Sequence, residues 1–519
     1  MRLVAFLFLL HFSGSLAYAS SISGYIRDIP PEPAYVRQLR HGKVAERRSG
    51  TIIIAHRGAC TLAPENTLEA YAAAMDFGAD GCEVDVRRTA DGVLVLFHDD
   101  MLDRLTDGFG QVEDLSYTDL LSLHPQLVFG TATKRTRPPT FAALIVLARQ
   151  RAMLLHLDVK QPGLDDELGR LLDEADLWDH VVAVNTQTLP KLLANPKLKL
   201  LRYKGAAYEA RRDVDPVAVK ALLSKPGQMI MLEDPRLTAM ELKRLPYAPV
   251  PLPSGLFTNW KKTPSPPASN ATNLVPIQHL RILQNRSDAD SVADMVALLS
   301  NNSEPDGSGG RPIDERRRRE RIVERAWAAE RLGHIGKKSK RVIELLEYQV
   351  QHPSLDPDWI LNGLDGHAAA RALGRLSASG SAPVLIQTFH RIDPELARVR
   401  NPQWTNNPLS WTDWRKMMIV PDLGRLRCDA SKQFLMRYVA MSEAEARELS
   451  VPQFEEATKA LLRQRLNRSE LFGLLQNPNS AVRGTAILEC LDHPTPDRKA
   501  ALRKAAPWVL DLPREKVPP

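Results

Sequence analysis

The residues best suited to chemistry are polar side chains at the ends of short apolar runs between positions 55 and 160. Glu83 and Asp85 lie two positions apart, so on an extended strand both carboxylates point to the same face. Asp158 and Lys160 repeat this spacing on a later run. Three carboxylates that converge from two strands are the oxygen-rich set that Mg²⁺ or Ca²⁺ prefers. The spacing therefore predicts a site for a divalent cation, Ca²⁺ or Mg²⁺, formed by Glu83, Asp85 and Asp158.

Two histidines and two basic side chains complete the candidate set. His56 and His98 each follow an apolar run, and an imidazole can accept or donate a proton near neutral pH. Arg57 and Lys160 would offset the charge of a bound phosphate, Arg57 through two parallel hydrogen bonds. Any one of these residues alone is more often structural. Together with the carboxylates they describe metal-assisted cleavage of a phosphate ester.

These side chains need a scaffold that brings several strand ends together. From position 51 onwards, short apolar runs alternate with helix-length segments, which is the pattern of parallel strands buried on both faces. Such a pattern predicts an α/β fold, a (β/α)8 barrel of the TIM type, whose active sites lie at the carboxyl ends of the strands. A doubly wound open sheet is the alternative. The runs are Thr51–Ala55, Cys82–Val86, Val93–Phe97, Met153–Val159, His180–Val184, Leu198–Tyr203, Gln228–Leu232 and Ala248–Leu252.

Several short motifs occur in order along the first part of this region. They are His56-Arg-Gly-Ala, Pro64-Glu65-Asn66-Thr67, Gly78-Ala-Asp-Gly-Cys-Glu83-Val-Asp85-Val, Thr89-x-Asp-Gly and His98-Asp-x-x-Leu-x-Arg104-x-Thr106. Together they closely resemble the glycerophosphodiester phosphodiesterase family. The resemblance is dense from about residue 51 to residue 160 and diffuse from there to about residue 260. It implies a (β/α)8 barrel with one divalent metal ion and two histidines that act as general acid and base.

By this resemblance the general acid and base fall on His56 and His98, and the phosphate-binding positions on Arg57 and Lys160. The implied reaction is metal-dependent hydrolysis of a small glycerophosphodiester to glycerol 3-phosphate and an alcohol, so we expect a phosphoric diester hydrolase. Two alternatives stay open. One is phospholipase D-like cleavage of a lysophospholipid or sphingolipid that gives a cyclic phosphate. The other is a catalytically weak barrel that serves as a binding module.

The resemblance also assigns the acidic residues. Glu83 and Asp85 match metal ligands, and Asp158 stands where the family usually has Glu. Because Asp is one methylene shorter, direct ligation by Asp158 needs a shifted backbone or an intervening water. Glu65 and Asn66 are expected to support the site. Asn66 also suits the cap of the alanine-rich helix that follows it.

The remaining N-terminal segments differ in composition from the barrel. Residues 1–19 combine a basic start, an apolar stretch and an Ala-x-Ala site, which predicts a cleaved signal peptide and a secreted or periplasmic protein. Residues 20–50 are polar and basic, and we expect a loosely held lead-in. The barrel is expected to span residues 51–262. Residues 263–312, rich in Pro, Gly, Ser and Asn at both ends, are expected to be a linker region.

Residues 313–519 are expected to form an all-α, HEAT-like domain. Two alanine-rich helical segments are offset by 41 residues when Leu332 is placed over Leu373, within the period of HEAT-type helical pairs. A third unit of similar character begins at Asn477. A generic helical bundle is the alternative.

Composition limits the classes of protein and partner. The chain has 519 residues, of which 44% are hydrophobic and 25% charged, and these values exclude collagen-like and wholly disordered proteins. Its four cysteines form no Cys-x-x-Cys pair, which argues against a zinc ribbon. The basic run Arg316–Arg319 lies among acidic residues, so it predicts a solvated helix start, and we expect no nucleic-acid partner. The helical region is a candidate surface for a protein partner. A membrane surface is compatible with the net charge of +7 but is not indicated.

Overall fold

The computed structural model describes most of the chain outside its ends and several internal segments. The signal peptide predicted for residues 1–19 and the predicted strand Ala248–Leu252 lie outside the described residues. The predicted strand Leu198–Tyr203 is described only as far as residue 201, without strand structure. The described residues are 29–106, 108–125, 136–184, 189–201, 220, 223–224, 229–244, 288–300, 315–391, 411–449 and 453–511.

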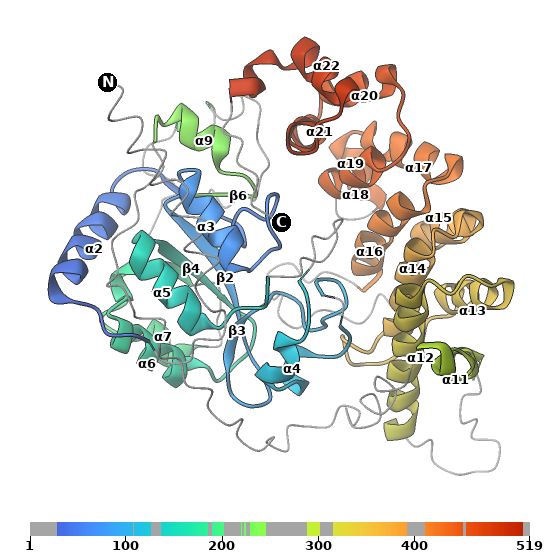
Figure 1. Cartoon of the computed structure of the whole chain (residues 1–519), viewed down its shortest axis with the longest axis horizontal. Helices are drawn as coiled ribbons and strands as arrows, with labels where there is room; N and C mark the ends of the chain where they lie inside the picture. Colours follow the sequence, from blue (N-terminus) through green and yellow to red (C-terminus); the bar gives the residue numbers. More distant parts are fainter. Residues whose placement is uncertain are drawn as a thin grey trace. The chain divides into compact units, whose positions relative to one another are not determined.

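The chain divides into two compact units, residues 1–271 with 507–519, and residues 272–506. The first unit contains all the described strands (Figure 1). Five of these strands are parallel and lie in the order β5-β4-β2-β1-β6. The strands are β1 (Ile52–Ala55), β2 (Gly81–Arg88), β3 (Leu94–Leu96), β4 (Leu154–Val159), β5 (Val181–Val184) and β6 (Met229–Leu232).

The crossover helices all pack on one face of this sheet (Figure 1). The same apolar cluster contains the outward residues of β1, β2 and β4 and residues of every one of these helices. A doubly wound sheet has helices on both faces, so the described strands form a half-barrel of the TIM type instead. The helices are α3 (Leu68–Asp76), α5 (Phe141–Arg151), α6 (Asp165–Ala175), α7 (Pro190–Leu193) and α9 (Arg236–Glu241).

The prediction that Val93–Phe97 is a barrel strand is wrong. Strand β3 pairs antiparallel with β2, through Val86 and Leu96 and their neighbours, and so lies outside the parallel order. The short connection between Arg88 and Leu94 explains this geometry. A parallel crossover needs a dozen or more residues, whereas a tight turn is enough for an antiparallel hairpin. His98 therefore reaches the site from a hairpin rather than from the end of a barrel strand.

The inner face of the sheet is layered from apolar to polar. At the amino-terminal ends of the strands, Ile52, Leu154 and Met229 belong to one buried apolar cluster. Further along the same strands, alternation places polar side chains on this same face. On β2, on β4 and directly after β1, these inward polar side chains include Glu83, Asp85, His156, Asp158 and His56.

Residues 34–47 do not form the loose lead-in that we expected, because they fold into helix α2 (Ala34–Arg47). The spacing of Val36, Arg40, Val44 and Arg47 places all four on one helix face, and all four are buried. Val36 and Val44 join the apolar cluster at the amino-terminal ends of the strands. Arg47 donates to the backbone oxygen of Ala152 over 2.7 Å. Half of the buried face is arginine, so the sequence of this helix lacks the apolar stripe that normally indicates a packed helix.

The second unit is helical, and its helices pack in succession (Figure 1). Helices α12, α14, α16, α19 and α21 each contact the next in chain order, and α11, α13, α15 and α17 do the same. Helix α11 lies within the predicted linker 263–312, so that region is not linker throughout. The helices are α11 (Asp288–Ser300), α12 (Glu315–Ile335), α13 (Lys340–Gln351), α14 (Leu364–Arg375), α15 (Ala382–His390), α16 (Trp411–Leu426), α17 (Asp429–Val439), α18 (Glu443–Leu449), α19 (Phe454–Leu462), α20 (Arg468–Leu475), α21 (Ser480–Asp492) and α22 (Pro496–Ala505).

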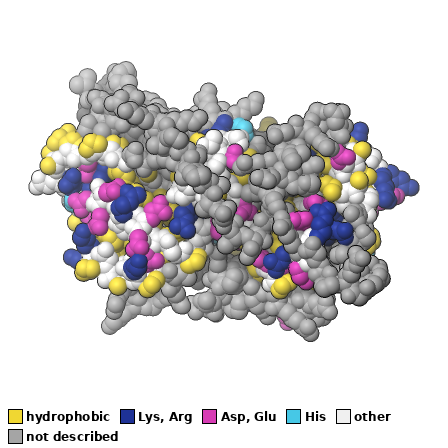
Figure 2. Space-filling view, turned by 90° about the horizontal axis from the view of Figure 1, so that it is seen from below, with side chains coloured by type: hydrophobic (Ala, Val, Ile, Leu, Met, Phe, Trp, Pro, Cys, Tyr) yellow, Lys and Arg dark blue, Asp and Glu magenta, His cyan; other side chains and the backbone are white. Residues whose placement is uncertain are grey.

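Of the side chains that the structure describes, three of the four arginines in the basic run at the start of α12 form local ion pairs. Arg317 pairs with Glu320 at 2.9 Å, and Arg318 pairs with Glu315 at 2.9 Å. Arg319 lies 3.3 Å from Asp356. Among the described atoms on the face drawn in Figure 2, positive and negative side chains are likewise interspersed. No helix among the described residues has the length and apolar character needed to cross a membrane.

The ion pair that fixes helix α2 gives a stability prediction. Arg40 is fully buried, donates to both carboxylate oxygens of Glu32 over 2.9 and 2.8 Å, and lies 2.9 Å from His180 Nε2. Replacing Arg40 with Ala removes both hydrogen bonds that it donates to the buried Glu32 carboxylate and leaves the longer contacts with Arg37 at 3.7 Å and Arg149 at 4.0 Å. We expect the free energy of unfolding of this unit to fall by about 3–5 kcal/mol, measured in urea. Lys191→Ala, which removes an exposed pair with Asp166, should leave the unfolding midpoint unchanged. Equal losses of stability in Arg40→Ala and Lys191→Ala would contradict a stabilising role for the buried pair of Arg40 and Glu32.

Candidate active site

Three carboxylates converge at the polar end of the half-barrel. Glu83 and Asp85 come from β2, and Asp158 comes from β4, where the strand register places it beside Asp85. One oxygen from each carboxylate lies within 4.8 Å of the others. Glu83 and Asp85 are buried, and Asp158 is half-buried. The structure thus brings together the three residues that the sequence grouped as metal ligands.

The charge balance of this cluster fits a divalent cation. Burial and the negative charge of Asp85 raise the pKa of Glu83 to about 8. Burial also favours the neutral form of Asp85, but Lys160, His98 and Arg57 outweigh it and hold the pKa of Asp85 well below its usual range. The cluster therefore has more carboxylates than its own cations can keep ionised. An oxygen-only donor set with this charge deficit suits Mg²⁺ or Ca²⁺.

Lys160 lies between two of these carboxylates. Its Nζ is 2.9 Å from an oxygen of Asp85 and 2.7 Å from an oxygen of Asp158. These contacts counter the large desolvation of a buried ammonium, and they raise the pKa of Lys160 above its ordinary value. The lysine is therefore charged at neutral pH and faces the same space as the carboxylates.

Arg57 lies in a tight turn directly after β1. Its φ of 57° is in the left-handed region, which costs a non-glycine residue about 1–2 kcal/mol. This conformation lets its backbone N–H donate to Glu83 over 3.0 Å. Its guanidinium donates to Glu65 over 2.9 Å and lies 3.4 Å from Asp85. Arg57 thus touches the carboxylate cluster through both its backbone and its side chain.

Asn66 holds Asp85 in place. Its side-chain amide donates to Asp85 over 2.7 Å, and its side-chain oxygen accepts from the Asp85 N–H and from the Tyr71 hydroxyl. Asn66 is buried, with a φ of 56°. The suggestion that Asn66 caps the following helix is wrong, because Thr67 accepts the hydrogen bond from the Ala70 N–H that caps α3.

A chain of ion pairs connects the second histidine to Arg57. His98 Nδ1 lies 2.6 Å from Asp99, whose carboxylate accepts from Arg104 over 2.5 and 2.7 Å. Arg104 in turn lies 3.2 Å from Glu65, the partner of Arg57. Burial would raise the pKa of Asp99, but Arg104 and His98 hold it well below its usual range. Asp99 therefore stays ionised and fixes the orientation of the His98 ring.

The two histidines have opposite protonation preferences. Burial and Arg57 favour the neutral form of His56, but Glu233 and Glu83 outweigh them and raise its pKa above the ordinary value. Burial, Arg57 and Lys160 lower the pKa of His98 below the ordinary value. Neighbouring titratable groups with pKa values pushed apart are the arrangement that acid–base pairs use.

Glu233 is the main site residue absent from the sequence-based assignment. It follows β6 directly, and one of its oxygens lies 2.6 Å from His56 Nδ1. Its other oxygen accepts a hydrogen bond from the thiol of Cys60 over 2.6 Å. The rule that identified His56, a polar residue at the end of an apolar run, would also have found Glu233.

Two further buried residues line the inner face. Arg87, two positions after Asp85, donates to the backbone oxygen of His98 over 3.2 and 2.8 Å, and so fixes the hairpin that carries this histidine. His156 lies beside Glu83 in the strand register, and burial lowers its pKa to about 4. His156 is therefore neutral at physiological pH.

Known proteins match the part of the chain that builds this site. Residues 56–197 match the model of the "Glycerophosphoryl diester phosphodiesterase family". A glycerophosphodiester phosphodiesterase of Caldanaerobacter subterraneus subsp. tengcongensis is 35% identical over 137 residues, which are 25% of this chain and 56% of the relative. Glycerophosphodiester phosphodiesterase 1 of Bos taurus is 46% identical over 90 residues, 17% of this chain and 27% of the relative.

Among solved structures, a glycerophosphodiester phosphodiesterase from Agrobacterium tumefaciens aligns with 37% of this chain and 99% of its own. Its sequence identity is 23% and the TM-score is 0.33. The chain spans about half the length of the first curated relatives that it matches, 56% and 51%. Over residues 56–197, this chain carries a domain of the glycerophosphoryl diester phosphodiesterase family.

Proposed function

We propose that this protein hydrolyses small glycerophosphodiesters to glycerol 3-phosphate and an alcohol. The observation that carries the proposal is the convergence of Glu83, Asp85 and Asp158 within 4.8 Å, in the segment that matches the family. We further propose that these carboxylates hold one divalent cation, Ca²⁺ or Mg²⁺. A bound divalent cation would stabilise negative charge on the phosphoryl oxygens.

The side chains of the site supply the remaining chemistry. The guanidinium of Arg57 and the ammonium of Lys160 can bind the other phosphoryl oxygens, because both are charged and border the carboxylate cluster. The lowered pKa of His98 suits a base that accepts a proton from the attacking water. The raised pKa of His56 suits an acid that donates a proton to the leaving alkoxide as the phosphorus–oxygen bond breaks.

The second candidate function is phospholipase D-like cleavage of a lysophospholipid or sphingolipid that gives a cyclic phosphate, called here the cyclising reaction. Asp158 favours it, because this residue stands where the resembled family usually has Glu. In that reaction a hydroxyl of the substrate, rather than water, attacks the phosphorus. Water and an internal hydroxyl would use the same pair of histidines. The two reactions differ only in their first stable product.

For the other parts of the chain we propose export through residues 1–19 and a HEAT-like repeat in the helical unit. The repeat is supported by the successive packing of α12, α14 and α16 and by the recurrence of a Leu-Gly pair near the end of each. Such a unit would be suited to bind a partner molecule across several helices.

The product and the cation can be tested together. Glycerophosphocholine incubated with the purified protein and Ca²⁺ or Mg²⁺ should give glycerol 3-phosphate in the phosphorus NMR spectrum. EDTA should abolish turnover, and excess divalent cation should restore it. A persistent cyclic phosphate would favour the cyclising reaction. Full activity in EDTA would contradict the cation site.

Removing either histidine should remove most of the activity. We expect His56→Ala and His98→Ala each to lower kcat by about 10²-fold or more, because general acid–base catalysis contributes at least that much. The control is His352→Ala, which changes an exposed histidine in the helical unit and should leave kcat unchanged. Near-normal turnover of a folded His56 or His98 variant would remove that residue from the mechanism.

Glu233→Gln tests the assignment of acid and base. The carboxylate of Glu233 raises the pKa of His56, so the neutral amide should lower it. If His56 is the acid, it must be protonated to act, and a lower pKa means that it loses its proton at a lower pH than in the parent protein. The alkaline limb of the kcat/KM profile should therefore move to lower pH. A shift of the acid limb instead would show that His56 is the base and would assign the role of acid to His98. An unmoved profile would show that Glu233 does not control His56.

A further inference from the structure

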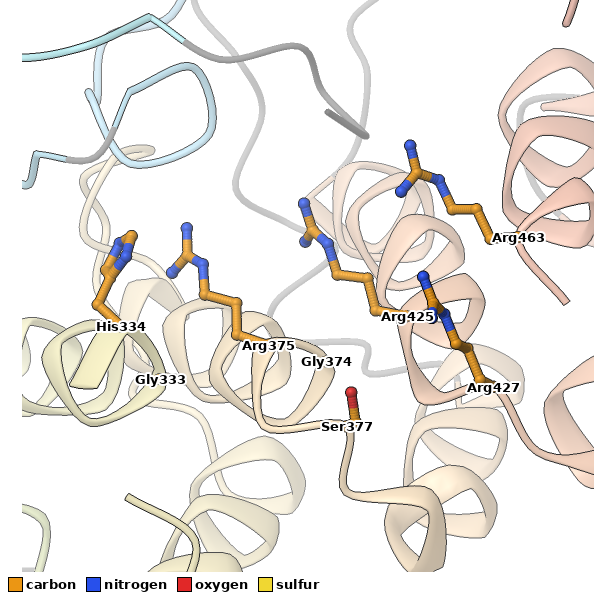
Figure 3. Close-up of a pocket in the computed structure, with 8 residues that line it drawn as sticks. All are labelled: Gly333, His334, Gly374, Arg375, Ser377, Arg425, Arg427 and Arg463. Atoms are coloured by element: carbon orange, nitrogen blue, oxygen red, sulfur yellow. The ribbon is translucent and has the colours of Figure 1, made fainter. Parts of the chain in front are cut away.

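The helical unit contains a basic pocket that the proposed reaction does not use. Its volume is about 430 Å³, within the range of small-molecule sites. Four arginines and one histidine contribute to its wall, and their side chains project to the same side (Figure 3). The lining residues are Gly333, His334, Gly374, Arg375, Ser377, Arg425, Arg427 and Arg463.

The pocket is built by repetition of one local sequence. A Leu-Gly pair near the end of each of α12, α14 and α16 is followed directly by a basic residue. Arg463 takes the equivalent place immediately after α19. Because these four helices pack in succession, their basic residues form a single row. In chain order the row is His334, Arg375, Arg425 and Arg463.

The repeated glycines bring these helices close together. A Cβ atom on Gly333 would lie 2.8 Å from Ala372 of the next helix, and one on Gly424 would lie 2.7 Å from Ala460. The absence of a side chain therefore permits the contact between neighbouring helices. Three residues after each repeated glycine, the backbone turns left-handed, at Gly336, Ser377 and Arg427. The basic residues are thus presented in the same register on each helix.

The residues that line the pocket include four arginines and no acidic residue, and nearby acidic side chains pair with some of these arginines. Glu330 pairs with Arg375. Glu330 also pairs with Arg371, whose Nε lies 2.5 Å from its carboxylate. Asp422 lies 2.7 Å from Arg425. Burial and the charge of Arg425 lower the pKa of Arg375 to about 10, which still leaves the guanidinium charged at neutral pH.

Arg463 likewise lies close to other positive side chains. Burial and the neighbouring Arg425 and Arg427 lower its pKa to about 10, against the opposing charges of Glu489 and Glu456. Like charges held this close destabilise one another, and a bound anion would relieve that repulsion. The pocket therefore favours a negatively charged ligand over an empty site.

We propose that this pocket binds a small anion that carries two or more phosphate groups. The planar guanidinium binds phosphate through paired hydrogen bonds. A phosphate group also carries more negative charge and more acceptor oxygens than a carboxylate, which suits a pocket with several arginines. Packed helices have axes about 8–10 Å apart, so linked phosphate groups can engage guanidinium groups from more helices of the row than a single phosphate can. A free oligophosphate and the phosphates of a lipid headgroup share this chemistry. The proposal does not depend on the reaction of the first unit.

Calorimetry with the full chain and sodium tripolyphosphate tests the proposal. The protein should first be treated with chelator and dialysed, because tripolyphosphate itself binds divalent cations. We expect saturable binding to one site at about 0.15 M salt, where non-specific surface attraction is largely screened. Inorganic phosphate should bind at least about tenfold more weakly, because it can engage fewer guanidinium groups.

Arg427→Gly separates binding from folding. Arg427 has a φ of 51°, a conformation that glycine adopts without strain, so this variant should melt no earlier than the parent protein. It should nevertheless bind tripolyphosphate about tenfold or more weakly, since a charge-assisted hydrogen bond contributes about 1.5–3 kcal/mol. The matched control is Arg468→Ala, which removes an arginine that is exposed and pairs with Asp497 outside the pocket.

The possible results separate the sources of phosphate. Sedimentation with phosphatidylcholine vesicles that contain cardiolipin, lost in Arg427→Gly, would support a lipid headgroup. Binding of tripolyphosphate without vesicle binding would support a free anion. The proposal is overturned if tripolyphosphate does not bind, or if Arg427→Gly and Arg468→Ala bind it equally. It is also overturned if inorganic phosphate binds as tightly as tripolyphosphate.

Discussion

The first unit depends on the burial of like charges at one end of a half-barrel. Glu83 and Asp85 lie side by side on the inner face of one strand, where neither can be ionised without an opposing charge. Several neighbouring groups offset or fix these two carboxylates. Lys160, Arg57 and Asn66 each contact Asp85, and the strained turn at Arg57 directs a backbone N–H to Glu83. The same constraint makes the site suitable for a divalent cation and for an anionic substrate.

Much of this site could be predicted from the sequence because strand alternation is a strict rule. Once residues 81–88 are taken as a strand, Glu83 and Asp85 must share a face. The structure then places Asp158 of the parallel neighbour beside Asp85. The strand–helix alternation likewise predicts crossover helices on a barrel-type sheet. The β2–β3 hairpin was misassigned because composition alone cannot distinguish parallel from antiparallel pairing; the five-residue connection, which excludes a crossover, was the available signal.

The features that sequence reasoning missed depend on contacts between distant positions. Glu233 acts on His56 across 177 positions, and Arg40 of α2 reaches His180 across 140. Arg40 and Arg47 look like surface residues in a polar segment, and only the tertiary structure provides buried partners for them. The same holds for the row of basic residues in the helical unit. An offset between repeats shows which positions are equivalent, but it does not show that their side chains line one pocket.

Helix α2 also determines where a fragment containing the first unit must begin in order to fold. The family match begins at residue 56, and the family-like motifs begin near residue 51, so similarity alone would place the domain boundary after α2. A protein shortened to that boundary would expose the apolar ends of β1, β4 and β6 to water. It would also leave His180 without Arg40, and the backbone oxygen of Ala152 without Arg47. The smallest fragment that folds like the whole unit should therefore begin before Glu32, well outside the segment that relatives share.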